Sequence, residues 1–131
     1  MRVKLIALLA LQGSAGVCAL PAAEAGGPAP LAVTVMLSDY RFSPDHLVFR
    51  RGASYRLLLE NRGKELHEFT APAFFHAVTL GTPEVLGPGG DVVLRPGERK
   101  ELRFVASAAG RYALSCADHD WAGMTGDIII E

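Results

Sequence analysis

Cysteine is scarce in this chain of 131 residues, and basic tracts and long apolar runs are missing. The sequence has two cysteines, 13 basic residues, 14 acidic residues and a formal net charge of −1. Without a basic stretch interleaved with aromatic residues, nothing in the sequence supports a nucleic-acid partner. The apolar run at residues 5–11 is followed by Gln12 and Gly13, and it is too short to span a bilayer.

The first 25 residues have the pattern of a secretory signal peptide. Arg2 and Lys4 precede the apolar run, and Ala23-Glu24-Ala25 fits a cleavage site with small residues. The alternative interpretation is a buried N-terminal helix. The pattern predicts an exported, periplasmic protein. A lipid anchor at Cys18 is not expected, because the three residues before it form a poor lipobox.

Cleavage after residue 25 would leave residues 26–131, which is the length of one domain. Residues 26–30 are rich in glycine and proline and are predicted to be a flexible linker, followed by one domain over residues 31–131. Because Arg2, Lys4 and Glu24 leave with the leader, 11 basic and 13 acidic residues remain, a net charge of −2. Cys116 is then the single cysteine. Its lack of a disulfide partner in an oxidising compartment favours metal ligation.

Apolar and polar residues alternate in several short segments separated by turns. The pattern predicts strands over residues 31–37, 47–50, 54–60, 65–70, 91–94, 99–105, 111–116 and 128–130. About eight short strands at roughly 8–12-residue spacing are typical of an all-β sandwich or barrel. Residues 39–44 are expected to break the first strand, and residues 72–90 to form a short helical or irregular insert.

Three metal-binding side chains lie within nine residues near the C-terminus, namely Cys116, His119 and Met124. A thiol, an imidazole and a thioether are softer donors than those that calcium and magnesium take, and zinc rarely takes a thioether. Copper suits this set best. With one more histidine, the set would be two imidazoles and a thiolate with an axial thioether, the arrangement of blue-copper electron-transfer sites.

His67 is the best candidate for that second imidazole. It shares a predicted strand face with Phe69, which is the core face, so its imidazole would be buried at one end of the sandwich. His46 and His76 are predicted to be ordinary surface histidines. Two other interpretations of Cys116 stay open: a nucleophile paired with a histidine, and a small buried apolar residue. The first lacks a third orienting group.

Further residues match one known family. Phe42-Ser43-Pro44, Leu47, Gly52 and Asn61 precede His67, whereas Gly110, Tyr112 and Gly126 accompany the Cys-His-Met segment. On these residues, the chain from about Val33 to Glu131 resembles the cupredoxins, the small blue copper proteins that include plastocyanin and pseudoazurin. The spacing of Cys116, His119 and Met124 is the specific part of this resemblance.

The resemblance implies a Greek-key β-sandwich with one type 1 (blue) copper ion at one end. It implies that His67, Cys116 and His119 are the strong ligands and Met124 is a more distant axial ligand. It further implies a monomeric electron carrier rather than an enzyme. Such a protein would cycle between Cu(I) and Cu(II) and exchange single electrons with envelope partners such as a cytochrome. No stable membrane insertion is expected after cleavage.

The resemblance also implies that the edge of His119 reaches the surface and passes the electron. Asp118, Asp120 and Trp121 flank it and are candidate docking residues, with the acids biasing the encounter toward a basic partner. The alternative is that these three are solvated loop residues without a role.

Two features depart from the family pattern. Many cupredoxins have Asn after the first ligand histidine, where it ties the two ligand loops together. Glu68 stands there in this chain and cannot donate the same hydrogen bond unless it is protonated. The insert, with Phe74-Phe75-His76, is the second departure.

These features keep open an alternative function, a periplasmic copper-trafficking or copper-resistance protein with the same ligands. A copper oxidase or reductase would need additional ligands, and a dinuclear copper centre would need a second cysteine.

Overall fold

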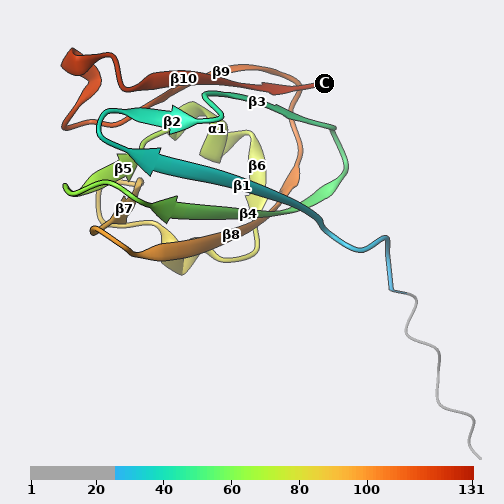
Figure 1. Ribbon diagram of the computed structural model, residues 1–131. Helices are drawn as coiled ribbons and strands as arrows, with labels where there is room; N and C mark the ends of the chain where they lie inside the picture. The colour runs from blue at the N-terminus through green and yellow to red at the C-terminus, as the bar shows by residue number, and fades with distance from the viewer. Residues whose placement is uncertain (1–25) are drawn as a thin grey trace, which may run out of the picture.

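The computed structural model describes residues 26–131 (Figure 1). The predicted signal peptide, residues 1–25, lies outside the described residues. Residues 26–30 are exposed and lead into the first strand. Within residues 26–131, no helix has the length and apolar character that a bilayer crossing requires.

Ten strands account for most of the regular structure of residues 26–131. In chain order they are β1 (Leu31–Ser38), β2 (Arg41–Ser43), β3 (His46–Phe49), β4 (Ser54–Asn61), β5 (His67–Phe69), β6 (Val78–Leu80), β7 (Val92–Leu94), β8 (Arg99–Ala106), β9 (Gly110–Ser115) and β10 (Thr125–Ile130). The α-helix α1 spans Pro72–His76, and the 3-10 turns η1 and η2 span Pro83–Val85 and Asp120–Ala122.

The strands form two layers (Figure 1). The first is a five-stranded sheet in the order β2-β1-β4-β8-β6, in which β1 and β4 are parallel and the other pairs are antiparallel. The second contains β3-β10-β9, and a bridge between Thr70 and Ser115 links β9 to the pair β5-β7. Two layers of strands around one core confirm the predicted all-β sandwich.

The core between the layers is built from alternate strand residues. In β4, Tyr55, Leu57 and Leu59 are buried. In β8, which pairs with β4, Leu102 and Phe104 are buried in the same way. Since strand side chains alternate between the two faces, this burial pattern agrees with the alternation from which both strands were predicted.

One end of this core is aromatic. The ring centroid of Phe49 lies 4.7 Å from that of Tyr55, 5.2 Å from that of Phe104 and 5.7 Å from that of Phe74. Phe74 comes from α1, so the insert contributes directly to the core. The Tyr55 hydroxyl accepts a hydrogen bond from the Arg50 amide (2.8 Å), which satisfies the polar atom of this end.

Two strands lie where the sequence predicted none. β2 falls in the segment expected to break the first strand, yet it pairs with β1 and buries Phe42. β6 lies in the insert and pairs with the edge of β8. A three-residue strand offers too few positions for alternation to be recognised. The first strand does end where a break was predicted, because β1 stops at Ser38, but the short strand β2 that follows was not foreseen. The predicted short helix of the insert is present.

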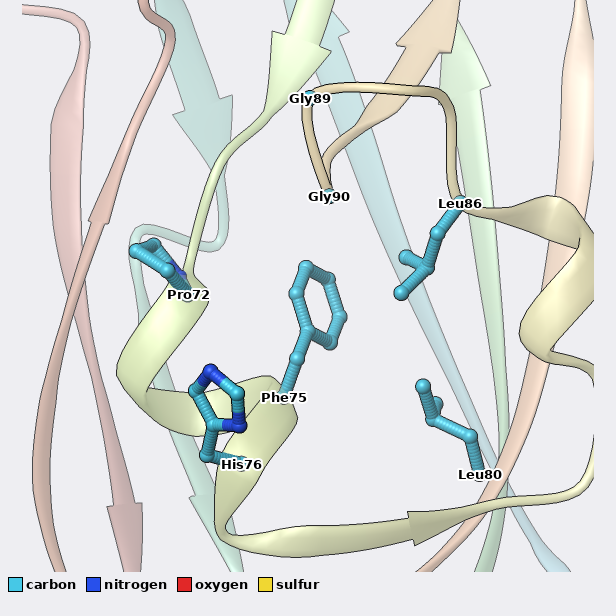
Figure 2. A pocket seen from close by; sticks show the side chains of 7 residues that line it. All are labelled: Pro72, Phe75, His76, Leu80, Leu86, Gly89 and Gly90. Carbon is cyan, nitrogen blue, oxygen red and sulfur yellow. The ribbon is translucent and has the colours of Figure 1, made fainter.

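The insert also surrounds a half-open pocket of about 330 Å³. It is lined by Pro72, Phe75, His76, Leu80, Leu86, Gly89 and Gly90. Figure 2 shows the Phe75 ring directed into the space between α1 and the glycine-containing loop. His76 lines this pocket and is exposed, as predicted for a surface histidine.

Candidate metal centre

Two distant parts of the chain supply the predicted ligands. His67 is the first residue of β5. Cys116 directly follows β9, His119 precedes η2, and Met124 directly precedes β10. Because β9 and β10 are antiparallel neighbours, the loop between them begins and ends at the same edge. Cys116 and Met124 are therefore brought together by the sheet itself.

Backbone hydrogen bonds hold this loop in a compact shape. The Cys116 amide donates to the Met124 carbonyl (3.0 Å), and the Met124 amide donates to the His119 carbonyl (3.3 Å). The His119 amide donates to the Cys116 carbonyl (3.1 Å). Gly123 has φ +82°, a left-handed conformation that favours glycine, and it lets the chain turn back into β10.

The candidate ligand atoms converge on one point. One imidazole nitrogen each of His67 and His119 and the thiol sulfur of Cys116 all lie within 4.8 Å of one another. The sulfur is 3.5 Å from His119 Nδ1 and 4.0 Å from His67 Nδ1. His67, Cys116 and Met124 are fully buried. The structure thus brings three predicted ligands together and holds the fourth, Met124, beside them through its backbone.

Each of the two imidazoles has a carboxylate at its far nitrogen. Asp39 Oδ1 lies 2.6 Å from His67 Nε2, and Glu65 Oε2 lies 2.8 Å from His119 Nε2. A carboxylate accepts the proton of Nε2, which leaves Nδ1 with the free lone pair on the side of Cys116. Both imidazoles are therefore oriented to bind a cation through Nδ1.

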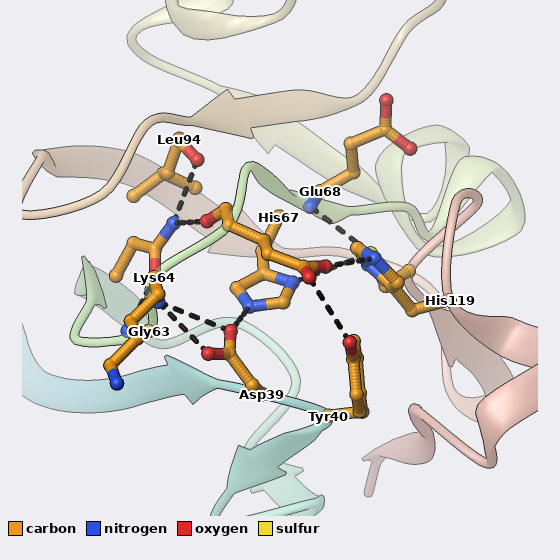
Figure 3. A network of polar contacts seen from close by, with 11 residues as sticks. Asp39, Tyr40, Gly63, Lys64, His67, Glu68, Leu94 and His119 are labelled. Carbon is orange, nitrogen blue, oxygen red and sulfur yellow. Dashed lines mark hydrogen bonds and ion pairs between the residues drawn. The ribbon is translucent and has the colours of Figure 1, made fainter.

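The carboxylate of Asp39 is itself held in place. The Lys64 amide donates to its two oxygens at 2.9 and 3.3 Å (Figure 3). The hydrogen bond from Lys64, followed by that from His67, lowers the pKa of Asp39 below its ordinary value. Asp39 is therefore an anion at neutral pH, bonded on one side to the backbone and on the other to an imidazole.

His119 is more enclosed than the resemblance implied. Its side chain is 12% exposed, and the carboxylate of Glu65 covers its Nε2. The Tyr40 hydroxyl donates to the other oxygen of Glu65 (3.1 Å), and this bond raises the pKa of Tyr40. The Tyr40 ring lies 4.8 Å from the His119 ring, between centroids. The edge that was expected to be open thus has a carboxylate and a phenol ring against it.

Asn61 fixes the turn that carries Glu65. Its buried Nδ2 donates to the carbonyls of Glu65 (2.8 Å) and Leu94 (2.9 Å), and its Oδ1 accepts from the Gly63 amide (2.8 Å). These bonds satisfy a fully buried polar side chain. Glycine is required at position 63, because a Cβ there would collide with the carboxylate of Asp39.

The sulfur of Cys116 accepts a hydrogen bond from the Glu68 amide (3.4 Å). Burial raises the pKa of the Cys116 thiol, and amide groups of Glu68, Asp118 and His119 partly oppose that rise. A metal cation binds the thiolate and displaces its proton, so cation binding would offset the cost of burying this group.

Glu68 contacts the sulfur through its main chain. Figure 3 shows its carboxylate directed away from the imidazoles of His67 and His119. Burial, followed by the charges of Asp118 and Asp91, raises the pKa of this carboxyl group. Its Oε2 is buried without a hydrogen-bond partner among the described residues. The side chain that stands in the family's Asn position is therefore destabilised in its charged form.

The donor set is consistent with a type 1 copper site. A buried thiol, two imidazoles whose Nδ1 atoms lie 3.5 and 4.0 Å from it and the buried thioether of Met124 are soft and borderline donors, which favour copper. The other histidines lie elsewhere. His46 Nδ1 is 2.8 Å from Asp127 Oδ1, and His76 lines the pocket of the insert.

The sequence predicted the sulfur and imidazole residues of this candidate centre but not its carboxylates. Asp39 is 28 residues from His67 in the sequence, and no local pattern connects them. Glu65 had no usable signal either. It lies in the turn before β5, which begins at His67 and not at residue 65 as predicted. Strand alternation therefore does not place its side chain beside the centre.

Three solved structures of low sequence identity share the fold. Auracyanin B is 17% identical, with a TM-score of 0.58 over 81% of this chain and 93% of its own. Reduced auracyanin from the photosynthetic bacterium Roseiflexus castenholzii is 15% identical, with a TM-score of 0.58 over 79% of this chain and 99% of its own. The periplasmic domain of cytochrome oxidase subunit II (CoxB) of Bradyrhizobium japonicum is 16% identical, with a TM-score of 0.56 over 80% of this chain and 86% of its own.

The sequence comparisons identify the family more directly. No curated protein matches the chain in sequence. The family model described as a cupredoxin-like domain matches residues 5–130, which is nearly the whole chain. The sandwich, the converging donors and this match lead to one conclusion: the chain belongs to the cupredoxin-like domain family.

Proposed function

We propose that this protein is a mononuclear type 1 copper protein that carries single electrons. The observation that supports this most directly is the convergence of Cys116 Sγ with one nitrogen each of His67 and His119 within 4.8 Å in a buried site. Met124 would supply a thioether donor. When bound, copper supplies one-electron chemistry by alternating between Cu(I) and Cu(II).

The residues of the chain prepare the site for such a change of charge. Asp39 and Glu65 fix the orientation of the imidazoles, and the Glu68 amide donates to the Cys116 sulfur. Full burial of His67 and Cys116 excludes water. Ligands that are already oriented and shielded from water move little between oxidation states. The reorganisation energy that opposes electron transfer is therefore small.

The partner, in this proposal, is a redox protein of the cell envelope such as a cytochrome. The loop that holds His119 has Asp118 and Asp120 exposed, and Trp121 is 78% exposed. Its indole Nε1 donates to the Asp118 carbonyl (2.8 Å), which orients the ring. These residues would offer apolar contact and negative charge to a basic partner. An exported, monomeric protein without enzymatic activity of its own accords with this role.

Copper addition to the purified protein tests the proposed site. Copper(II) should produce an intense visible band from thiolate-to-copper charge transfer, and Cys116→Ser should abolish it. Ser115→Ala changes the neighbouring strand residue and is the matched control, because it leaves all four candidate ligands in place. This control should keep the band. A colourless protein that binds zinc tightly would refute the proposal.

Copper trafficking or copper resistance with the same ligands is the rival function. The copper-loaded protein can be mixed with a cytochrome and, separately, with a copper chelator. Fast electron exchange with slow copper loss supports an electron carrier. Slow exchange with fast copper loss supports trafficking. The burial of the ligand atoms favours the first outcome, because a chelator has little access to them.

A further inference from the structure

The two carboxylates of the centre have a geometry in common. Both accept from an Nε2 atom, at 2.6 Å for Asp39 and 2.8 Å for Glu65. Both also accept a second bond that fixes their position, from the Lys64 amide in one case and the Tyr40 hydroxyl in the other. Each imidazole therefore lies between a candidate metal position and a fixed negative charge.

We infer that Asp39 and Glu65 are positioning residues that hold bound copper toward its oxidised form and thus lower its reduction potential. The inference rests on the proposed function and deepens it. Cu(II) carries one more positive charge than Cu(I). A nearby anion therefore stabilises Cu(II) more, by the Coulomb interaction with that additional charge.

The two carboxylates differ in solvent exposure, and this difference sets which of them should change the reduction potential more. The side chain of Asp39 is 27% exposed, beside an imidazole that is fully buried. The side chain of Glu65 is 48% exposed, beside an imidazole that is 12% exposed. Solvent and salt screen the more exposed charge more strongly. Asp39 should therefore affect the potential more than Glu65 does.

The negative charge of each carboxylate acts on a bound metal through the imidazole, in addition to orienting the ring. A metal-bound imidazole binds its cation more strongly when its other nitrogen donates to an anion, because the ring becomes a better donor. A neutral acceptor in the same place would orient the ring equally well. The carboxylate adds the charge, and the charge is the part of the interaction that distinguishes the two oxidation states.

Asp39→Asn and Glu65→Gln separate orientation from charge, since both amides can still accept from Nε2. The potential of the copper-loaded full chain is measured by spectroelectrochemical titration. Each variant should shift the Cu(I)/Cu(II) ratio at a fixed potential toward Cu(I) by about tenfold, or about 59 mV for a one-electron couple. Asp39→Asn should give the larger shift. Asp45→Asn is the matched control, because Asp45 is an exposed acid that bonds neither imidazole.

A second measurement uses the metal-free protein. Nitrogen-15 NMR should show both imidazoles protonated at Nε2 in the wild type and in the two amide variants. Asp39→Ala and Glu65→Ala should lose this preference, each at its own histidine. A purely structural role of the carboxylates would change the imidazole signals or the folding stability without raising the potential of the amide variants.

Two results would overturn the inference. One is a shift in potential for both amide variants that is no larger than that of Asp45→Asn. The other is protonation at Nδ1 of both imidazoles in the metal-free wild type. A wild-type protein without the visible copper band refutes the proposed function itself, and the inference with it. An intact band with an unmoved potential refutes the inference alone.

Discussion

The two ends of β4 are built in opposite ways. At its start, Tyr55 belongs to the aromatic end of the core with Phe49 and Phe104. At its end, six residues later and about 20 Å away at the usual rise per residue, Asn61 and His67 are the buried polar residues of the centre. The aromatic end buries apolar area, and the metal end buries polar atoms with specific partners. The comparison teaches that stability and chemistry are supplied by separate ends of one sandwich.

The largest expected effect comes from removing the ring at the centre of the aromatic end. Phe49→Ala should lower the free energy of unfolding by about 3–5 kcal/mol, because it leaves a cavity among Tyr55, Phe74 and Phe104. Urea unfolding measures this loss. The visible copper band of the folded fraction should stay unchanged.

Val48→Ala is the control for this variant, since Val48 is the next strand residue and is 47% exposed. It should change stability by less than about 0.5 kcal/mol. If Phe49→Ala shifts the copper band as strongly as it lowers stability, the two ends are coupled and the comparison fails.

Asn61→Ala tests the metal end and should have an intermediate effect. It leaves the carbonyls of Glu65 and Leu94 and the Gly63 amide without their partner. The expected loss of stability is about 1–3 kcal/mol. Because the turn that holds Glu65 loosens, copper affinity should fall as well, measured by competition with a chelator. A stability loss with unchanged affinity would show that the turn does not support the centre.

The docking proposal concerns the exposed surface of the same end. Asp118→Asn combined with Asp120→Asn should slow electron exchange with a basic cytochrome by about tenfold at low salt, since steering charges act on the association rate. The measurement is stopped-flow kinetics over a range of ionic strength. The difference from the wild type should vanish at high salt. An exchange rate that is unchanged and insensitive to salt would contradict the docking role.

The smallest expected effect lies on the outer face behind the aromatic end. Arg56 and Arg103, which lie opposite each other on β4 and β8, lower the pKa of Glu101 to about 2 from an ordinary 4.5. A carboxyl group with a lowered folded-state pKa stabilises the fold above its ordinary pKa, and this contribution is lost as pH falls toward 2.

Glu101→Gln should therefore be slightly less stable than the wild type at pH 7 and equally stable near pH 2. Urea midpoints across this pH range check the difference. Because the group is on the surface, the difference at pH 7 should also shrink in high salt. A difference that grows as the pH falls would contradict the assigned sign.

The strands were predictable where apolar and polar residues alternate over a long enough segment. Tyr55, Leu57 and Leu59 identify β4 and its inward face, and the structure agrees. β2 and β6 were not predicted because each has only three residues. Each forms a strand by pairing with β1 or β8, which the rest of the fold places beside it. Such strands depend on tertiary contacts, which a local pattern does not contain.

Prediction of the candidate centre was possible for some residues and not for others. Cys116, His119 and Met124 share one loop, so their spacing predicted them as ligands, and the strand position of His67 predicted it as the fourth. The carboxylates of Asp39 and Glu65 reach the imidazoles from other turns, and their chemistry shows only after folding. The sequence indicated only that the Glu68 carboxylate cannot donate a hydrogen bond to the site unless it is protonated. It did not foresee that the Glu68 amide would donate to that sulfur.

The full burial of Cys116 makes it an internal reporter of motion. It is the only thiol among residues 26–131, and its surface is inaccessible in the folded state. A thiol-alkylating reagent can reach it only when this end of the sandwich opens, so the labelling rate of the metal-free protein measures local opening. In the proposed copper site, the metal would have to enter by an opening of the same region. The labelling rate and the rate of copper uptake should therefore rise together with temperature and denaturant.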